Sequence, residues 1–251
     1  MSGPRSEWLA DSSGELLDEL LEALESPLAA VDKEKREETK DQIDNLRNFL
    51  SKIKEHGQRA DRIVKSMLVH AREGEDTASS TDLNVLIEET LNLAYHGARA
   101  ENESFNVSLQ RDLDPRVGEV QLYPQAFTRV VLNLLNNSFY ATYERKTQSN
   151  DTDYSPTVKV STRDLGGEVE ARVWDNGTGI PQATVEKIFD PFYTSKPTGE
   201  GTGLGLSMSY ETVVQQHHGR FEVDTKEGEY TEFIITLPRQ AAQASRAGGA
   251  A

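Results

Sequence analysis

Apolar residues in the first part of the chain recur with the period of a helix that packs along one side. From Ile43 to Ala71 they fall alternately three and four residues apart, which predicts a heptad seam on one long helix. An earlier stretch, GELLDELLEALE, also places its leucines on one face, and Ser26 with Pro27 predicts a new helix start after it. A helical hairpin alone has too little core to hide two apolar stripes from water. Residues 1–75 are therefore expected to form a stem that dimerises as a four-helix bundle, unless the seam packs on the rest of the chain.

The pattern changes after residue 75 to a mixture of helical and alternating segments. The polar stretch EDTASSTD is expected to be a linker, followed by an amphipathic helix over residues 81–97 and an apolar helix over residues 124–144. Alternation predicts strands at FNVSL, TVKVS and EVEARVW and a final hairpin in GRFEVDTKEGEYTEFIITLP. Helices interleaved with antiparallel strands predict an α+β fold, a two-layer sandwich over residues 76–240 with helices on one face of the sheet. Residues 241–251 are expected to be a disordered tail.

Composition narrows the classes of partner. The chain has 42 acidic and 27 basic residues, so its formal net charge is −15, and the basic residues do not cluster. This charge argues against nucleic acid and anionic membrane surfaces as partners. The absence of cysteine excludes disulfides, thiolate zinc sites and a cysteine nucleophile. Because the sequence has no apolar run of membrane-spanning length and no signal peptide, a cytoplasmic location is expected.

Two short motifs contain residues suited to binding a metal and a flat ligand. In NLLNNSFYA, Asn133 and Asn137 lie four residues apart, so on a helix both amides project from the same face. Asparagine oxygens are hard neutral ligands, which suit a magnesium ion already surrounded by phosphates and waters. In VWDNGTGIP, Asp175 would emerge from the end of a strand, and Gly177 and Gly179 would let the backbone turn tightly past a flat ligand. Each motif alone is weak, because polar helix faces and Asn-Gly turns are common.

A third motif, PFYTSKPTGEGTGLGLSMSY, places much backbone freedom directly before a helix. Gly199, Gly201, Gly203 and Gly205 alternate up to the helix start, where backbone N–H groups and the helix dipole favour a triphosphate. A plain linker would not continue at once as a helix. The stretch also differs from the P-loop and from the dinucleotide-binding fingerprint, since it lacks the GK[ST] ending and a directly preceding strand. The glycines therefore predict a phosphate-binding segment that can close as a lid.

Together these motifs resemble those of the ATP-binding domain of bacterial sensor histidine kinases. NLLNNSFYA resembles the N box, DNGTGIP the G1 box, FDPFYTSK the F box and GEGTGLGLS the G2 box, in the family's order and spacing. The resemblance covers roughly residues 80–238, and four linked motifs make it specific. It implies a histidine kinase-like fold that binds ATP with Mg²⁺.

The resemblance also implies roles for individual residues. Asp175 would receive the adenine amino group with the help of Thr231, Asn137 would hold Mg²⁺, and the glycines from Gly199 to Gly205 would wrap the phosphates. The residues expected to bind ATP are Asn133, Asn137, Tyr140, Asp175, Gly177, Gly179, Ile180, Lys196, Gly199, Gly201, Thr202, Gly203, Leu204, Gly205, Leu206 and Thr231.

The resemblance leaves open which cation neutralises the phosphates. Many relatives have a basic residue three positions after the second asparagine, where this chain has Tyr140. Lys196 at the end of the F box, or Arg145 beyond the N box, could supply the charge instead. Relatives also usually have glycine where this chain has His218.

Asn133 separates this chain from the related ATP hydrolases of the same fold, such as gyrase and the heat-shock chaperone. Those enzymes typically have glutamate at the matching position, where the carboxylate activates the attacking water. An amide cannot accept that proton at neutral pH. Robust ATP hydrolysis is therefore not expected, and a nucleophile from elsewhere is expected to take the phosphoryl group.

The stem raises the question of the acceptor. EHGQRADRIVKSMLVHAR resembles the second helix of the dimerisation and phosphotransfer domain of the same kinases, but the family's motif of histidine followed by an acid is absent. The residues that follow the five histidines are Gly57, Ala71, Gly97, His218 and Gly219. None provides the adjacent carboxylate that takes the imidazole proton. The stem can be aligned with the first helix of that domain in two registers. In the preferred register the motif has been cut away. In the other, EALESPL occupies the place of the motif, with Glu22 where histidine belongs.

The sequence as a whole predicts the catalytic region of a two-component histidine kinase. It would transfer the γ-phosphoryl group of ATP to a histidine on another chain or on a missing segment, with a response regulator as partner protein. The alternative is a nucleotide-gated protein-interaction module without phosphotransfer.

Overall fold

The computed structural model divides the chain into two compact units. One comprises Met1–Glu73 with Thr194–Thr202, and the other comprises Gly74–Tyr193 with Gly203–Ala251. The structure describes residues 32, 35, 37–53, 57, 77–102, 104–148, 151, 153–197 and 201–239.

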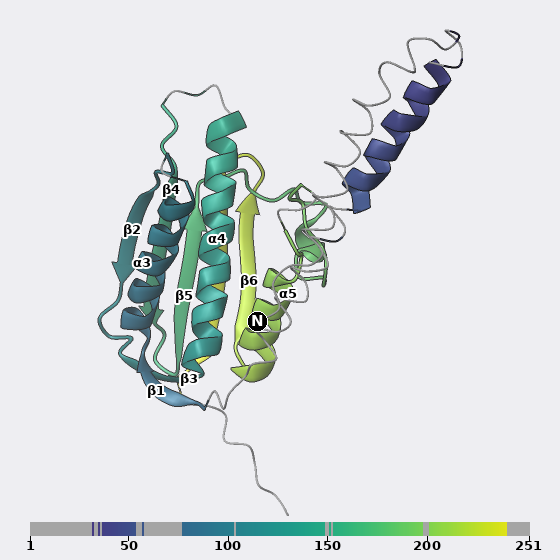
Figure 1. Ribbon diagram of the computed structural model, residues 1–251. Helices are drawn as coiled ribbons and strands as arrows, with labels where there is room; N and C mark the ends of the chain where they lie inside the picture. Colours follow the sequence, from purple (N-terminus) through teal and green to yellow (C-terminus); the bar gives the residue numbers. More distant parts are fainter. Residues whose placement is uncertain are drawn as a thin grey trace, which may run out of the picture. The chain divides into compact units, whose positions relative to one another are not determined.

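In the first unit, residues 37–53 form a continuous helix, the purple ribbon of Figure 1. Three apolar side chains of the predicted seam region are largely exposed on it, namely Leu46 (47%), Phe49 (64%) and Ile53 (64%). The predicted helix GELLDELLEALE and the seam beyond Gly57 lie outside the described residues.

The second unit is built on a five-stranded sheet (Figure 1). In spatial order its strands are β2 (Ser108–Leu113), β4 (Thr157–Asp164), β5 (Glu168–Asp175), β7 (Tyr230–Pro238) and β6 (Arg220–Lys226). Three of the pairings are antiparallel, as predicted, but β2 and β4 are parallel. A parallel pair needs a long crossover, and the chain between β2 and β4 supplies it as a short strand and a long helix.

Helices cover one face of this sheet, so the predicted α+β two-layer architecture is confirmed (Figure 1). They are α3 (Leu83–Glu101), α4 (Pro124–Gln148) and α5 (Gly205–Glu211), which continues into a π-helix, Thr212–Gln216. Asp82 caps α3 by accepting a hydrogen bond from the Val85 N–H at 3.1 Å. α3 and α4 each extend about one turn beyond the predicted end.

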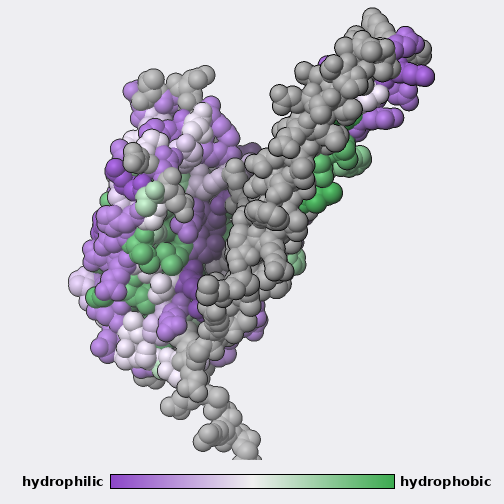
Figure 2. Space-filling view, in the orientation of Figure 1, coloured by the Kyte–Doolittle hydropathy of each residue, from purple (hydrophilic) through white to green (hydrophobic). Residues whose placement is uncertain are grey.

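The core lies between the sheet and the helices α3 and α4. Its largest fully buried side chains include Phe127, Leu134 and Leu135 of α4. The amphipathic pattern expected of α3 is present, since five apolar side chains on it are buried: Leu83, Leu86, Ile87, Leu91 and Ala94. The visible surface of this unit is mostly hydrophilic, with small apolar areas near α3 (Figure 2). Two apolar side chains of α3, Val85 and Leu93, are exposed.

A separate two-stranded sheet was not predicted. β1 (Ser79–Asp82) pairs antiparallel with β3 (Glu119–Leu122). The second half of the expected linker EDTASSTD is thus a strand. Its exposed polar residues show no alternation, and its pairing depends on β3, whose alternate side chains are buried. The predicted strand FNVSL was placed too early, since β2 begins at Ser108.

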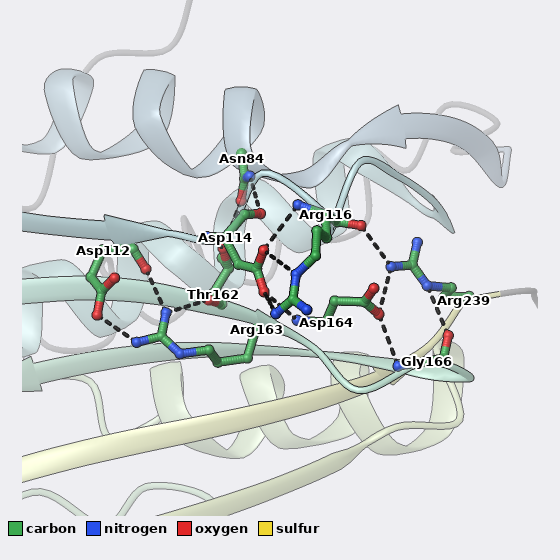
Figure 3. Close-up of polar contacts among 9 residues, drawn as sticks. All are labelled: Asn84, Asp112, Asp114, Arg116, Thr162, Arg163, Asp164, Gly166 and Arg239. Carbon is green, nitrogen blue, oxygen red and sulfur yellow. Dashed lines mark hydrogen bonds and ion pairs between the residues drawn. The ribbon is translucent and has the colours of Figure 1, made fainter.

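A polar network holds the end of the sheet at which β4 turns into β5 (Figure 3). At its centre the buried carboxylate of Asp114 accepts hydrogen bonds from Arg116 Nε at 3.0 Å and Arg116 Nη2 at 2.8 Å. The Arg116 guanidinium, with backbone N–H groups of Arg116 and Asp164, holds the pKa of Asp114 well below its usual range. Thr162 Oγ1 accepts from the Asp114 N–H at 3.0 Å and donates to Asn84 Oδ1 at 2.7 Å, which joins the network to α3.

Arg239 ties the end of β7 to the same network (Figure 3). Its guanidinium donates to the carbonyl oxygens of Arg116 at 3.0 Å, Val117 at 2.7 Å and Gly166 at 3.0 Å, and pairs with Asp164 at 2.8 Å. Side chains from several segments therefore close this end of the sheet. The candidate site lies at the opposite end, where β5 finishes at Asp175.

Candidate functional site

The N box lies on α4 and packs directly against the start of α5. Asn133 Nδ2 donates to Ser209 Oγ at 3.1 Å, so the amide is oriented by α5. A Cβ on Gly205 would lie 2.1 Å from Asn133 Oδ1, so a larger residue at this position would displace the Asn133 side chain. Asn137 and Tyr140 follow on α4 and are half-buried. The N box and the helical end of the G2 box are thus brought together as predicted.

Asp175 ends β5 with an almost completely buried carboxyl group, only 1% exposed. Burial raises its pKa to about 6, and the nearby Ser138 hydroxyl and the Gly177 N–H partly oppose this rise. The Gly177 N–H donates to Asp175 Oδ1 at 2.9 Å. Thr231, also buried, is the direct cross-strand partner of Asp175 on β7, so the predicted pair lies side by side.

Ser138 was missed by the sequence interpretation, although it follows Asn137 directly. It is fully buried on α4, and its hydroxyl makes no hydrogen bond of good geometry to any described residue. The buried Ser138 hydroxyl and the buried Asp175 carboxyl group thus place two polar groups together between α4 and β5. Only the tertiary contact between α4 and β5 reveals it.

The G1 turn is packed between α4 and the β6–β7 turn. A Cβ on Gly177 would lie 2.6 Å from the Ala141 Cβ of α4. Gly179 has a φ of +65°, and a Cβ there would lie 2.2 Å from the Lys226 carbonyl oxygen. The half-buried Ile180 follows, and its N–H donates to Thr225 Oγ1 of β6 at 3.0 Å. These contacts fix the backbone that follows Asp175.

Arg145 and Tyr154 also hold the G1 turn in place through side-chain contacts. Arg145 Nη1 donates to the carbonyl oxygens of Asn176 at 2.8 Å, Gly177 at 3.2 Å and Glu229 at 2.9 Å. Its guanidinium carbon lies 4.7 Å from the centroid of the Tyr154 ring. These contacts favour a role for Arg145 on the turn over the role on phosphate that the sequence suggested. Tyr154 had no signal in the sequence.

The F box and the G2 box meet where the chain leaves the second unit and re-enters it. The Phe192 N–H donates to the Gly203 carbonyl oxygen at 2.8 Å, and both residues have positive φ, 69° and 70°. A Cβ on Gly203 would lie 2.3 Å from the Phe192 carbonyl carbon, so glycine is required there. Leu204 is buried next to this contact in sequence, and Leu206 packs on the core.

The remaining predicted residues belong to the first unit or lie outside the described residues. Lys196, Gly201 and Thr202 are in the first unit. Within it, the Lys196 N–H donates to Thr194 Oγ1 at 3.2 Å, and a Cβ on Gly201 would lie 2.6 Å from that same oxygen. Gly199 is not among the described residues.

The described residues are also informative about metals and membranes. They contain no group of three or more histidine or acidic side chains that could hold a metal ion by itself. Among the same residues, no helix combines the length and the hydropathy that crossing a membrane requires.

Comparison with known proteins agrees with this geometry. Residues 123–241 match the family described as histidine kinase-, DNA gyrase B-, and HSP90-like ATPase. The chain is 29% identical over 180 residues to the sensor histidine kinase ZraS of Escherichia coli K12, which covers 72% of this chain and 35% of ZraS. It is 32% identical over 194 residues to the sensor kinase CckA of Brucella abortus, which covers 74% of this chain and 20% of CckA. The chain thus spans about a third or less of the length of these relatives.

Solved structures show the same fold. The nucleotide-free catalytic domain of the histidine kinase ThkA matches with a TM-score of 0.54 at 27% identity, over 65% of this chain and 97% of that domain. ThkA in complex with the response regulator protein TrrA matches with a TM-score of 0.57 at 22% identity, over 94% of this chain and 62% of ThkA. The fold and these relatives together show that the chain contains a histidine kinase catalytic domain homologous to those of sensor histidine kinases, in which residues 123–241 match the histidine kinase-, DNA gyrase B- and HSP90-like ATPase family.

Proposed function

We propose that the second unit binds ATP with Mg²⁺ and transfers the γ-phosphoryl group to a histidine other than the five in this chain. The observation that carries the proposal is the buried carboxyl group of Asp175 at the end of β5. A carboxyl group that is 1% exposed and has its pKa raised to about 6 is costly to the fold. Such groups concentrate at functional sites, and an adenine amino group would supply a further donor besides the Gly177 N–H.

The residues around Asp175 have complementary roles in the proposal. Asp175 accepts from the adenine amino group, and Thr231 stands beside it to support that contact. Asn137 offers an amide oxygen to Mg²⁺, which would neutralise part of the phosphate charge. The glycines that lead into α5, with the helix N-terminus behind them, contribute backbone N–H groups to the phosphates. Lys196 is the proposed cation from the F box.

The proposed transfer is direct and requires a separate nucleophile. The bond from the γ-phosphorus to the bridging oxygen of ADP breaks as a bond to the imidazole nitrogen of the acceptor forms. The imidazole proton passes to an acid beside that acceptor histidine. Asn133 cannot act as a base on water, and its Nδ2 is engaged by Ser209 at 3.1 Å. Transfer to histidine is therefore favoured over hydrolysis.

Two protein partners belong to the proposal. The exposed apolar side chains of Leu46, Phe49 and Ile53 support a homodimer through the stem, because a second copy would remove this surface from water. A response regulator is the proposed recipient of the phosphoryl group, and the complex of ThkA with TrrA is the precedent among similar folds.

A second candidate function is a nucleotide-gated interaction module that performs no phosphotransfer. The observation in its favour is that none of the five histidines is followed by an acidic residue. In this case ATP would change the contacts of the lid and the stem with partner proteins.

Calorimetry with ATP and Mg²⁺ tests the first step, and radiolabelled ATP separates the two candidates. We expect ATP to bind and to raise the melting temperature, and label to pass to a supplied stem that carries a histidine followed by an acid. Binding without transfer to any tested stem would support the interaction module. If ATP causes neither heat nor thermal protection, both candidates are wrong.

A further inference from the structure

We infer that Arg145 is a positioning residue for nucleotide recognition, which holds the G1 turn so that the Asp175 carboxyl group is presented to adenine in one orientation. The inference rests on the proposed ATP-binding function. It assigns to Arg145 a role at the adenine end of the site, away from the phosphates.

Arg145 and Asp175 are linked through a single peptide group, the one that joins Asn176 to Gly177. Its N–H donates to Asp175 Oδ1 at 2.9 Å. Its carbonyl oxygen accepts from Arg145 Nη1 at 2.8 Å. Because a peptide group is planar and rigid, a donor that fixes the oxygen also fixes the direction of the N–H. Arg145 therefore controls the orientation of Asp175 through one rigid plane without touching it.

Charge adds to this geometric effect. A hydrogen bond from a guanidinium to a carbonyl oxygen is charge-assisted and stronger than one between neutral groups. It also polarises the peptide group, which makes the N–H at the opposite end a better donor. In the ionised state, the Asp175 carboxylate is thereby stabilised at a site where burial disfavours it.

The same guanidinium joins two turns of the chain. Besides the Asn176 oxygen, it binds the carbonyl oxygens of Gly177 at 3.2 Å and of Glu229 at 2.9 Å, and Glu229 lies in the turn between β6 and β7. Three carbonyl dipoles that converge on one point repel one another unless a cation lies between them. Thr231, the neighbour of Asp175 on β7, lies two residues after Glu229. The Arg145 cation therefore holds both the segment that follows Asp175 and the segment that precedes Thr231.

Tyr154 restrains the guanidinium and the turn from the other side. Its ring lies under Arg145 at 4.7 Å, a distance suited to a cation–π contact. Its hydroxyl donates to the Asn176 carbonyl oxygen at 3.0 Å, and burial raises the pKa of Tyr154 to about 12, so the donor proton is retained. The Asn176 side chain is engaged as well, since it accepts from the Thr157 N–H at 2.7 Å and donates to the Ser155 carbonyl oxygen at 2.9 Å.

The test compares Arg145→Gln with Arg145→Lys, and uses Arg220→Gln as a matched control. Arg220 is exposed and pairs with Glu168 at the other end of β5. Calorimetry would measure the affinities of all variants for ATP and for GTP in the presence of Mg²⁺. GTP is informative because guanine has a carbonyl oxygen where adenine has its amino group, so an oriented Asp175 acceptor discriminates against it.

We expect Arg145→Gln to weaken ATP binding by about tenfold or more and to reduce the preference for ATP over GTP. Arg145→Lys should recover part of both, because an ammonium can donate to the carbonyl oxygens but cannot stack on Tyr154 as a planar group. Amide hydrogen exchange at residues 177–180 should be faster in Arg145→Gln than in the wild type. Arg220→Gln should match the wild type in every measurement.

Three outcomes would overturn the inference. If Arg145→Gln keeps the ATP affinity and the ATP preference of the wild type, the turn does not depend on Arg145. If it loses ATP and GTP affinity in equal proportion, Arg145 stabilises the fold without orienting Asp175. If the wild type itself binds neither nucleotide, the proposed function fails and the positioning role with it, a result distinct from the first two. Should Arg145→Gln fail to fold, Arg145→Lys alone decides by its ATP preference.

Discussion

Asn133 and Gly205 are in direct contact, so that a Cβ on Gly205 would lie only 2.1 Å from Asn133 Oδ1. Ser209, one turn further along α5, binds the other end of the same amide at 3.1 Å. The N box and the beginning of α5 are therefore one packed unit. A change on either side of this contact is transmitted to the other.

Gly205→Ala is expected to displace the Asn133 side chain and to weaken ATP binding by about tenfold or more. The overpacking should also cost roughly 1–3 kcal/mol of unfolding free energy. Calorimetry and denaturant unfolding would measure the two effects. Gly167→Ala is the matched control, because a Cβ on Gly167 meets nothing within 4 Å. Equal behaviour of the two variants would contradict the packed contact.

Asp175→Asn should stabilise the nucleotide-free protein at neutral pH while it abolishes the thermal protection by ATP. The wild-type carboxyl group has its pKa raised from 3.8 to about 6, so keeping it ionised in the fold costs on the order of 3 kcal/mol. An amide carries no such cost. Melting temperatures with and without ATP would test this, with Asp153→Asn, at an exposed position, as the control. A less stable Asp175→Asn protein at neutral pH would show that burial of the charge is not costly.

The same residue predicts a specific dependence of stability on pH. Between about pH 4 and pH 6 the folded state keeps the Asp175 proton that the unfolded state has lost. The unfolding free energy should therefore fall as the pH rises through this window. Denaturant unfolding at several pH values would show a steeper fall for the wild type than for Asp175→Asn. Parallel curves would argue against the raised pKa.

Asp114 predicts the opposite dependence in acid. Arg116 holds its pKa below the usual 3.8, so as the pH falls the unfolded state takes up a proton before the folded state does. The stability that the Asp114 carboxylate contributes is present above this pH range and is lost as the pH falls through it. Asp114→Asn should lower the melting temperature at neutral pH and make the acid limb of the stability curve shallower. An unchanged acid limb would show that Asp114 does not contribute to the loss of stability at low pH.

The exposed side chains of the stem predict an effect on assembly. Replacing Phe49 with glutamate places a charge on the proposed dimer interface and should shift the protein toward the monomer. Analytical ultracentrifugation at several concentrations would measure the shift. Leu93→Glu on α3 is the control, because Leu93 is exposed to a similar extent outside the stem. A dimer that tolerates glutamate at position 49 would place the interface elsewhere.

Local pattern in the sequence was sufficient for most of the second unit. The period of α3 and the alternation of β4 and β5 follow from which side chains face the core, so each could be predicted from its own segment. β1 could not, because its residues are polar and largely exposed and its hydrogen bonds come from a strand about forty residues away. The parallel pairing of β2 with β4 likewise depends on a crossover that no local pattern encodes.

The candidate site divides in the same way. Asn133, Asp175 and Gly205 belong to contiguous motifs whose spacing is visible in the sequence. Arg145 was noticed only as a nearby charge, and its contacts to the G1 turn and to Glu229 join segments 31 and 84 residues apart. Ser138 was missed for a related reason, since its importance depends on burial against β5. Side chains that support a site from outside its motifs thus become visible only in three dimensions.

The hydrogen bond between Phe192 and Gly203 also has a consequence for how this domain can diverge. The bond fixes the two ends of the intervening segment close together. Residues inserted between these two positions therefore add only the small extra entropic cost of closing a longer segment. The length and the sequence of the intervening segment can therefore vary between related proteins at little cost in stability. The Phe192–Gly203 contact itself would be kept in such variants.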